Sequence, residues 1–240
     1  MVLFLLAGCS SQRAETTLTQ TAVLPEIWDI SITSDLDWLR PILNSCAQAE
    51  ENVGLIDIPS TLPETQNKPV DFRFLVSDTP SSDNPIFDLG LEYLAVIVHP
   101  DNPVTQLTWQ EFADIQAGVI TNWQDTSSGQ SAGFSEPISV FHYMDKSGIQ
   151  QFLYSKINKT QSANFSVLLA PGPYEMMTGV KMEGGGIGIL PERLVDESVI
   201  QLMISGIENQ DLAVPILVET KTEPKGSALN FLVCLQKQIN

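Results

Sequence analysis

The sequence has few histidines, few cysteines and few basic residues. Two histidines and three cysteines in 240 residues provide no cluster with the ligand count of a structural zinc site, so we expect no metal and no other cofactor. Lysine and arginine number 12 against 29 acidic residues, a formal net charge of −17. Because this charge repels the phosphate backbone of nucleic acids, it excludes a nucleic-acid partner.

Signatures of catalysis are also lacking. No Gly-x-Ser-x-Gly nucleophile elbow is present, and the glycine run at 184–188 lacks the Gly-x-Gly-x-x-Gly spacing of a dinucleotide site. His99 and His142 both fall at the ends of predicted strands, where a surface or packing role is usual. Asp35 and Asp37 are interpreted as charges favoured by the dipole at a helix start. We therefore expect a protein that is not an enzyme.

The first nine residues are a short apolar run that ends in Leu6-Ala7-Gly8-Cys9. This tetrapeptide resembles a bacterial lipobox, which implies a signal peptide over 1–8, acylation of Cys9 and a lipidated tether over 9–22. No lysine or arginine precedes the apolar run, so the signal peptide is interpreted as truncated at its start. The expected location is extracytoplasmic, with the protein anchored by lipid to a bacterial membrane.

The other two cysteines are Cys46 and Cys234. An exported location permits a disulfide between them. Each lies on or near the apolar stripe of a different predicted helix, and thiols on such stripes are commonly buried without a partner. We expect two separately buried thiols.

Strand patterns and helix patterns alternate after the tether, which indicates the α/β class. Strands are expected at 27–32, 53–58, 70–76, 91–98, 138–141 and 212–218, and 184–191 is interpreted as a tight turn that enters a short strand. Helices are expected after an N-cap at Ser34 or Asp35, from Thr108 to a stop at Gly118, after Ser147, and at the C-terminus. The apolar run 91–98 is typical of a buried strand that leaves one lobe for another. The predicted lobes are 23–98 plus 195–240, and 99–194, joined by two crossings.

Three predicted turns carry small hydroxyl residues, at Thr33-Ser34, Ser77-Asp78 and Ser147-Gly148. Turns of this kind collect unpaired backbone N–H groups and the positive end of a helix dipole, which together bind an oxyanion without a lysine. Any one of them alone is more typical of an ordinary helix N-cap than of an anion site. The combination of all three favours an anion site.

Several segments resemble one family. The sequence reads Asn-Pro-Val at 102–104, Leu-Thr-Trp at 107–109 and Gly-Val-Ile-Thr-Asn-Trp at 118–123. This pattern is similar to that of the phosphate-binding-protein-like periplasmic solute receptors of ABC importers. Four further matches follow in family order, at 70–80, 140–148, 186–189 and the C-terminal helix.

The resemblance implies the two-lobed type 2 periplasmic-binding-protein fold, with mixed sheets flanked by helices and two hinge crossings. Such receptors trap a small oxyanion or organic anion between the lobes and deliver it to an ABC permease in the membrane, and the resemblance implies a monomer. The implied ligand-binding residues are Ser34, Ser77, Asp78, Tyr143, Ser147, Gly148 and Ile149. In phosphate receptors the aspartate at the place of Asp78 accepts the proton of a protonated phosphate, which sulfate does not offer.

Two positions depart from the family. Tyr143 stands where the family has an arginine, and Ile149 where it has a threonine. A guanidinium lost from the site removes charge-assisted hydrogen bonds of about 1.5–3 kcal/mol each. Lys146 either replaces that charge or is simply an exposed lysine. Tyr143 and Tyr174 either contact the ligand or pack within a lobe.

Two functions remain open. The first is import of a phosphate-like oxyanion or a related small anion. The alternative is a receptor-like lipoprotein, a sensor or assembly partner, that kept the fold but lost anion binding and transport. Retention of Ser77, Asp78, Ser147 and Gly148 favours import, whereas Tyr143 and Ile149 favour the alternative.

Overall fold

The computed structural model describes residues 24–59, 68–79, 82–144, 147–157 and 166–239. The predicted signal peptide, the tether with Cys9, and Lys146 lie outside the described residues. The chain forms a mixed α/β fold of two lobes, as expected. None of the helices in the described ranges combines the length and the apolar composition that a bilayer crossing requires.

The principal sheet has nine strands and extends through both lobes. Its order is β2-β1-β3-β11-β4-β8-β6-β7, with β9 paired to β4. The strands are β1 (Glu26–Ile32), β2 (Val53–Asp57), β3 (Phe72–Val76), β4 (Ile86–Val98), β6 (Ser139–Tyr143), β7 (Leu168–Ala170), β8 (Gly186–Pro191), β9 (Ile200–Gln201) and β11 (Ala213–Thr220). β1 is parallel to β2 and β3, and β6 is parallel to β7 and β8, whereas β4 and β11 run antiparallel to their neighbours. A separate two-stranded sheet pairs β5 (Gln106–Thr108) with β10 (Met203–Ser205).

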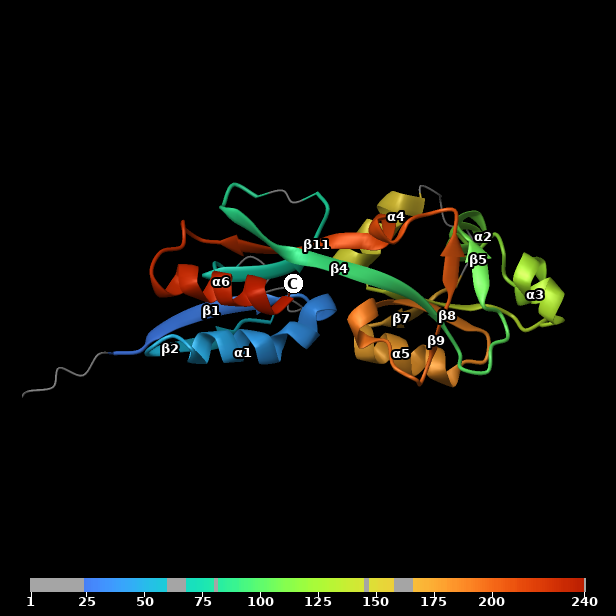
Figure 1. The fold of residues 1–240 in the computed structure, drawn as a ribbon, viewed down its shortest axis with the longest axis horizontal. Coiled ribbons are helices and arrows are strands. Elements are labelled where there is room, and N and C mark those ends of the chain that lie inside the picture. The colour runs from blue at the N-terminus through green and yellow to red at the C-terminus, as the bar shows by residue number, and fades with distance from the viewer. Residues whose placement is uncertain (1–23, 60–67, 80–81, 145–146, 158–165, 240) are drawn as a thin grey trace, which may run out of the picture.

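The strand β4 joins the two lobes (Figure 1). β4 pairs with β11 of lobe 1 as far as Tyr93, and from Leu94 onward it pairs with β8. We call the group around β1, β2, β3 and β11 lobe 1, and the group around β5 to β10 lobe 2. The expected strand 91–98 is the second part of β4 only. A bulge, where Gly90 has a φ of 143°, interrupts the apolar alternation and hides the first part from a pattern search.

Helices cover the sheet in each lobe (Figure 1). Lobe 1 has α1 (Arg40–Gln48), which follows the 3-10 turn η1 (Ser34–Leu39), and α6 (Ser227–Ile239). Lobe 2 has α2 (Trp109–Gln116), α3 (Ser127–Ala132), α4 (Gly148–Ile157) and α5 (Pro173–Met182). Shorter 3-10 turns are η2 (Trp123–Asp125), η3 (Glu192–Leu194) and η4 (Asn209–Leu212).

The predicted limits of α2 are confirmed. Thr108 and Glu111 form a reciprocal capping box, in which each side chain accepts the backbone N–H of the other residue. Gly118, with a φ of 73°, ends the helical segment.

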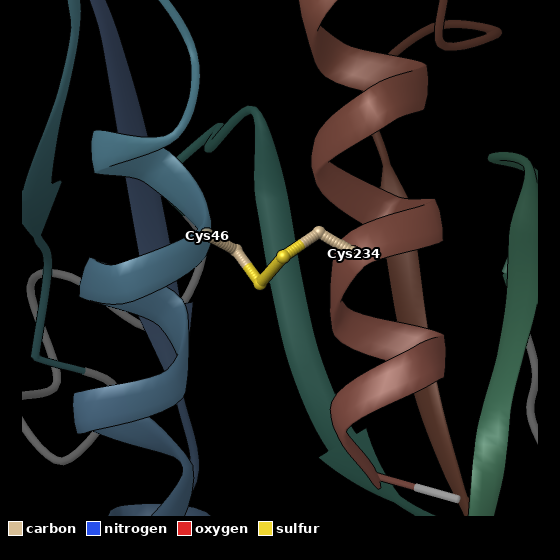
Figure 2. Close-up of a disulfide and its surroundings, with 2 residues drawn as sticks. All are labelled: Cys46 and Cys234. Atoms are coloured by element: carbon tan, nitrogen blue, oxygen red, sulfur yellow. A yellow bond between two sulfur atoms is a disulfide. The ribbon is translucent and has the colours of Figure 1, made fainter.

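Cys46 and Cys234 form a disulfide between α1 and α6, with their Cα atoms 5.7 Å apart (Figure 2). The expectation of two separate thiols was therefore wrong. Cys46 is buried and Cys234 is partly buried against the core, and because the two helices pack beside each other on lobe 1, the two cysteines meet. A stripe in the sequence indicates burial and carries no information about which other stripe it faces.

Candidate functional site

The candidate site lies where the start of α4 in lobe 2 meets the start of η1 in lobe 1. The first N–H groups of a helix have no partner within the helix, and the helix dipole makes this end favourable for negative charge. Oδ2 of Asp35 accepts the N–H of Gly148 at 2.7 Å and that of Ile149 at 3.3 Å. Two donors of lobe 2 therefore converge on one oxygen atom of lobe 1.

Asp35 is fully buried, with 0% of its surface exposed. Oδ1 has no hydrogen-bond partner among the described residues. Burial raises the pKa of this carboxyl above its usual 3.8. Hydrogen bonding with the Ser147 hydroxyl and the N–H groups of Ile149 and Gly148 acts in the opposite direction without cancelling the effect of burial, and the neighbouring charge of Asp37 adds to the increase. The buried charge is thus only partly compensated.

The expected N-cap at Ser34 or Asp35 was wrong. η1 begins at Ser34 itself, Thr33 takes the cap position, and no side chain caps the turn. The carboxylate of Asp35 is directed to α4 and therefore does not cap its own helix.

Ser147 and Gly148 form the start of α4. The Ser147 hydroxyl accepts the N–H of Gln150 at 3.2 Å, which is the geometry of a helix cap. A methyl group on Gly148 would overlap the carbonyl oxygen of Val76, at the end of β3 in lobe 1. Only glycine allows the two lobes to approach this closely here. We call the Ser147 hydroxyl and the N–H groups of Gly148 and Ile149 the α4 donors.

Ser34 is half-buried and lies near the start of another helix. A Cβ built on Gly172, the residue before α5, would be 3.6 Å from the Ser34 carbonyl oxygen. Tyr174, in the first turn of α5, is 52% exposed. Ser34 therefore lies in the interlobe region, beside α5.

The turn at Ser77 and Asp78 follows β3 and meets α4 farther along the helix. The Ser77 hydroxyl accepts the N–H of Thr79 at 3.1 Å, so it closes its own turn. Asp78 is exposed, and its Oδ2 lies 3.5 Å from the hydroxyl of Ser155, in the second half of α4. The carboxylate that the structure brings to the α4 donors is that of Asp35.

Tyr143 is buried within lobe 2, with 1% of its surface exposed. Its hydroxyl donates to the Ile189 carbonyl at 2.9 Å, and its backbone N–H donates to Oε1 of Gln150 at 2.9 Å. Burial raises its pKa well above 10.0, and the nearby carboxylates of Asp35 and Glu92 raise it further. The phenol therefore stays neutral and joins β6 to β8, and its contact with a ligand remains a prediction.

Three residues at the lobe junction, Arg193, Glu92 and Trp38, form a cluster that was not predicted from the sequence. Nε of Arg193 is 2.9 Å from Oε1 of Glu92, whose side chain is 1% exposed. The Arg193 guanidinium lies over the ring of Trp38. Burial raises the pKa of Glu92 despite the opposing effect of Arg193. The sequence did contain one indication of this cluster, because Glu92 is a single charged residue in the apolar run 91–98 of β4.

Asp35 was also missed as a site residue, although the sequence carried a signal for it. It follows directly on Ser34, in the turn that the family resemblance assigned to anion binding. Its charge was assigned to the dipole of its own helix. The helix that Asp35 contacts begins 113 residues later, at Gly148.

Two lobes connected through one long strand, with helix N–H groups of one lobe facing a loop of the other, define a two-lobed binding protein. The family model described as "PBP superfamily domain" matches residues 71–193, which is more than half of the chain. The protein belongs to this family, and its fold is that of non-catalytic binding proteins. No curated protein matches the sequence.

Solved structures with the same fold include phosphate receptors and regulatory domains. A phosphate ABC transporter substrate-binding protein with bound phosphate from Clostridium perfringens aligns with a TM-score of 0.71 and 20% identity, over 88% of this chain and 93% of that one. An ABC-type phosphate transport receptor from Vibrio cholerae aligns with a TM-score of 0.60 and 18% identity, over 89% of this chain and 95% of that one. The CcmR regulatory domain of Synechocystis PCC6803, in complex with 2-PG, aligns with a TM-score of 0.60 and 13% identity, over 89% of this chain and 97% of that one. The expected type 2 periplasmic-binding-protein fold is confirmed.

Proposed function

We propose that the protein is the extracytoplasmic substrate-binding component of an ABC importer and binds a phosphate-like oxyanion or a related small anion between its lobes. One observation carries the proposal. The N–H groups of Gly148 and Ile149 already hold a carboxylate oxygen that belongs to the other lobe, at 2.7 and 3.3 Å. A donor pair with this geometry suits an oxyanion that bridges the lobes.

Each predicted ligand residue has a role in the proposal. Gly148 and Ile149 supply backbone N–H groups, and Ser147 supplies its hydroxyl. Ser34 and Ser77 approach from lobe 1 when the lobes close, and Asp78 accepts a proton that the anion carries. Tyr143 ends β6, the strand that leads to the site, and its bond to Ile189 holds this strand against β8.

The remaining elements of the proposal concern the rest of the chain. The predicted division is lobe 1 at 23–98 plus 195–240 and lobe 2 at 99–194, except that β9 and β10, at 200–205, pair with strands of lobe 2 and belong to it. The lobes rotate about the junction in β4 when the solute binds. Acylation of Cys9 holds a monomer at the outer side of a membrane, close to its ABC permease. The fold that the chain shares with transport receptors supports this arrangement.

A second candidate function has a specific observation in its favour. The Asp35 carboxylate accepts the N–H groups of Gly148 and Ile149, and the family arginine is replaced by the neutral Tyr143. Both features suit a receptor-like lipoprotein that has lost anion binding and serves as a sensor or assembly partner.

A thermal-shift screen separates the two candidates. The panel is phosphate, sulfate, tungstate, molybdate and a set of small organic anions. A ligand present at 100 times its Kd stabilises the protein by about 2.7 kcal/mol, which is a readily measured shift. A selective shift supports import, whereas no shift with any anion overturns it and favours the second candidate.

A matched pair of serine variants then locates the site. Ser147→Ala removes a hydroxyl at the α4 donors, so it should weaken anion binding by about 10-fold or more. Ser131→Ala is the control, because this exposed serine lies in α3 and its hydroxyl donates to the carbonyl of Ser127, one turn away in the same helix, at 2.8 Å. Equal affinity in both variants would place the anion elsewhere.

A further inference from the structure

We propose that Asp35 is a built-in occupant of the anion site, which holds the two lobes together in the absence of solute and which an incoming anion must displace. We call its bonds to Gly148 and Ile149 the Asp35 contact. The proposal concerns an interlobe contact in the protein itself, and it rests on the proposed function only for the identity of the competing solute.

The first argument is chemical equivalence. A carboxylate is an oxyanion, and Oδ2 of Asp35 accepts two N–H groups at the start of a ten-residue helix. These are the groups that the proposed ligand would use. Because each N–H donates one strong hydrogen bond, Asp35 and an external anion cannot both hold them with full strength.

The second argument concerns the position of the two partners. Asp35 belongs to η1 of lobe 1, and Gly148 opens α4 of lobe 2. The Asp35 contact is therefore made only while the lobes are close together. In solute receptors a bound ligand supplies the contacts that favour the closed form. In this chain Asp35 supplies contacts of the same kind.

The third argument is that the carboxylate is bound incompletely. Its surface is 0% exposed, and Oδ1 has no hydrogen-bond partner among the described residues. A buried acceptor without a donor is costly. An anion that also gains contacts from lobe 1 can therefore replace Asp35, whose side chain then regains water.

The consequence is a restriction on affinity and specificity. A solute must offset the loss of the Asp35 contact, so its apparent affinity is lower than that of the unoccupied α4 donors. An anion that enters without displacing Asp35 meets a buried negative charge at close range. Asp35 is thus a determinant of which anions bind.

Removing the carboxylate tests this directly. Asp35→Ser abolishes the contact, and Asp35→Asn keeps the shape of the side chain without its charge. Asp37→Asn is the matched control, since it removes a charge from the same turn at a side chain that pairs with Arg40 at 2.9 Å. Small-angle X-ray scattering without ligand measures closure, and calorimetry with inorganic phosphate and with sulfate measures affinity.

We expect a larger radius of gyration for Asp35→Ser than for the unmodified protein and Asp37→Asn. We also expect at least a tenfold lower Kd of Asp35→Ser for phosphate or sulfate, with Asp35→Asn between the two. An unchanged radius in Asp35→Ser overturns the proposal, and so does weaker anion binding, which would make Asp35 a ligand contact. If Asp35→Ser does not fold, the same criteria apply to Asp35→Asn.

Two outcomes separate this inference from the proposed function. If Asp35→Ser opens the lobes while no anion binds to either protein, the interlobe role of Asp35 is established and anion transport is overturned. If both proteins bind phosphate equally and have the same radius, transport stands and the role of Asp35 is overturned.

Discussion

The Arg193 guanidinium lies 4.1 Å from the centre of the Trp38 ring, and its Nε lies 2.9 Å from Oε1 of Glu92. Trp38 belongs to η1 of lobe 1, Glu92 to β4 and Arg193 to η3. The arrangement combines a cation–π contact with an ion pair whose carboxylate is buried. It is a second link between η1 and the chain segments that lead into lobe 2, beside the Asp35 contact.

Arg193→Met should reduce the free energy of unfolding by about 2–3 kcal/mol, because it leaves Glu92 buried and unpaired while the exposed part of the arginine is screened by solvent. Urea unfolding measures the change. Arg73→Met is the control, since its pair with Glu219 is longer, at 3.9 Å, and the carboxylate of this pair is more exposed than that of Glu92, so the change should cost less than about 1 kcal/mol. If adding Glu92→Gln to Arg193→Met restores no stability, the cost does not come from the unpaired carboxylate.

Gly148→Ala should separate the lobes. The added methyl group would overlap the Val76 carbonyl oxygen, so the start of α4 must move away from the end of β3. We expect a larger radius of gyration without ligand and weaker binding of any anion found in the screen. Gly184→Ala is the control, because a methyl group there meets nothing within 4 Å. A compact Gly148→Ala protein with normal affinity would show that this close approach is not needed for closure.

Asp35 should make stability depend on pH. Burial raises its folded-state pKa above 3.8, so the folded chain binds this proton more tightly than the unfolded chain does. The resulting stabilisation is fully present below 3.8 and is lost as the pH rises through the folded-state pKa. Asp37 and Tyr143 lie near this carboxyl. Both are present in the unmodified protein and in Asp35→Asn, so their own effects cancel when the two proteins are compared.

The measurement is urea unfolding of the unmodified protein and Asp35→Asn at a series of pH values from about 3.5 to 7.5. The stability of the unmodified protein relative to Asp35→Asn should decrease as the pH rises. A relative stability that increases with pH would show that the N–H groups of Gly148 and Ile149 outweigh burial. A flat difference would show that the carboxyl is solvated in solution.

Reduction of the disulfide should destabilise lobe 1. The bond closes a loop between positions 188 residues apart, and crosslinks of long loops contribute about 3–5 kcal/mol. Unfolding measured with and without reductant should show this loss. The paired variant Cys46→Ser with Cys234→Ser should be insensitive to reductant, and an equal response in the variant would assign the effect to another cause.

Local sequence signals predicted many of the elements. The strand at 53–58 and the helix from Thr108 to Gly118 lie within a residue or two of β2 and α2, because alternation, the capping box and a left-handed glycine act over a few neighbouring residues. The first part of β4 was missed because the bulge at Gly90 interrupts its apolar pattern. The two-stranded sheet of β5 and β10 was missed because three-residue strands carry too little pattern.

The sequence predicted that the three hydroxyl turns share one site, but it did not predict which side chain would contact the start of α4. Ser147-Gly148 does open a helix, as the sequence indicated, and the first N–H groups of this helix donate to a carboxylate outside it. The carboxylate on those groups comes from Asp35, whereas Asp78 lies beside Ser155. Sequence spacing specifies the donors, but the acceptor depends on how two lobes meet.

By itself, the sequence determined the α/β class, the resemblance to solute receptors and the absence of catalytic signatures, and it predicted an anion site at the start of α4. These follow from periodicity, turn chemistry and charge, which act locally. Only the tertiary structure decided that Cys46 bonds to Cys234 and that Asp35 occupies the N–H groups of Gly148. Both pairs join residues more than 100 positions apart, and such contacts are fixed by the packing of whole helices and lobes.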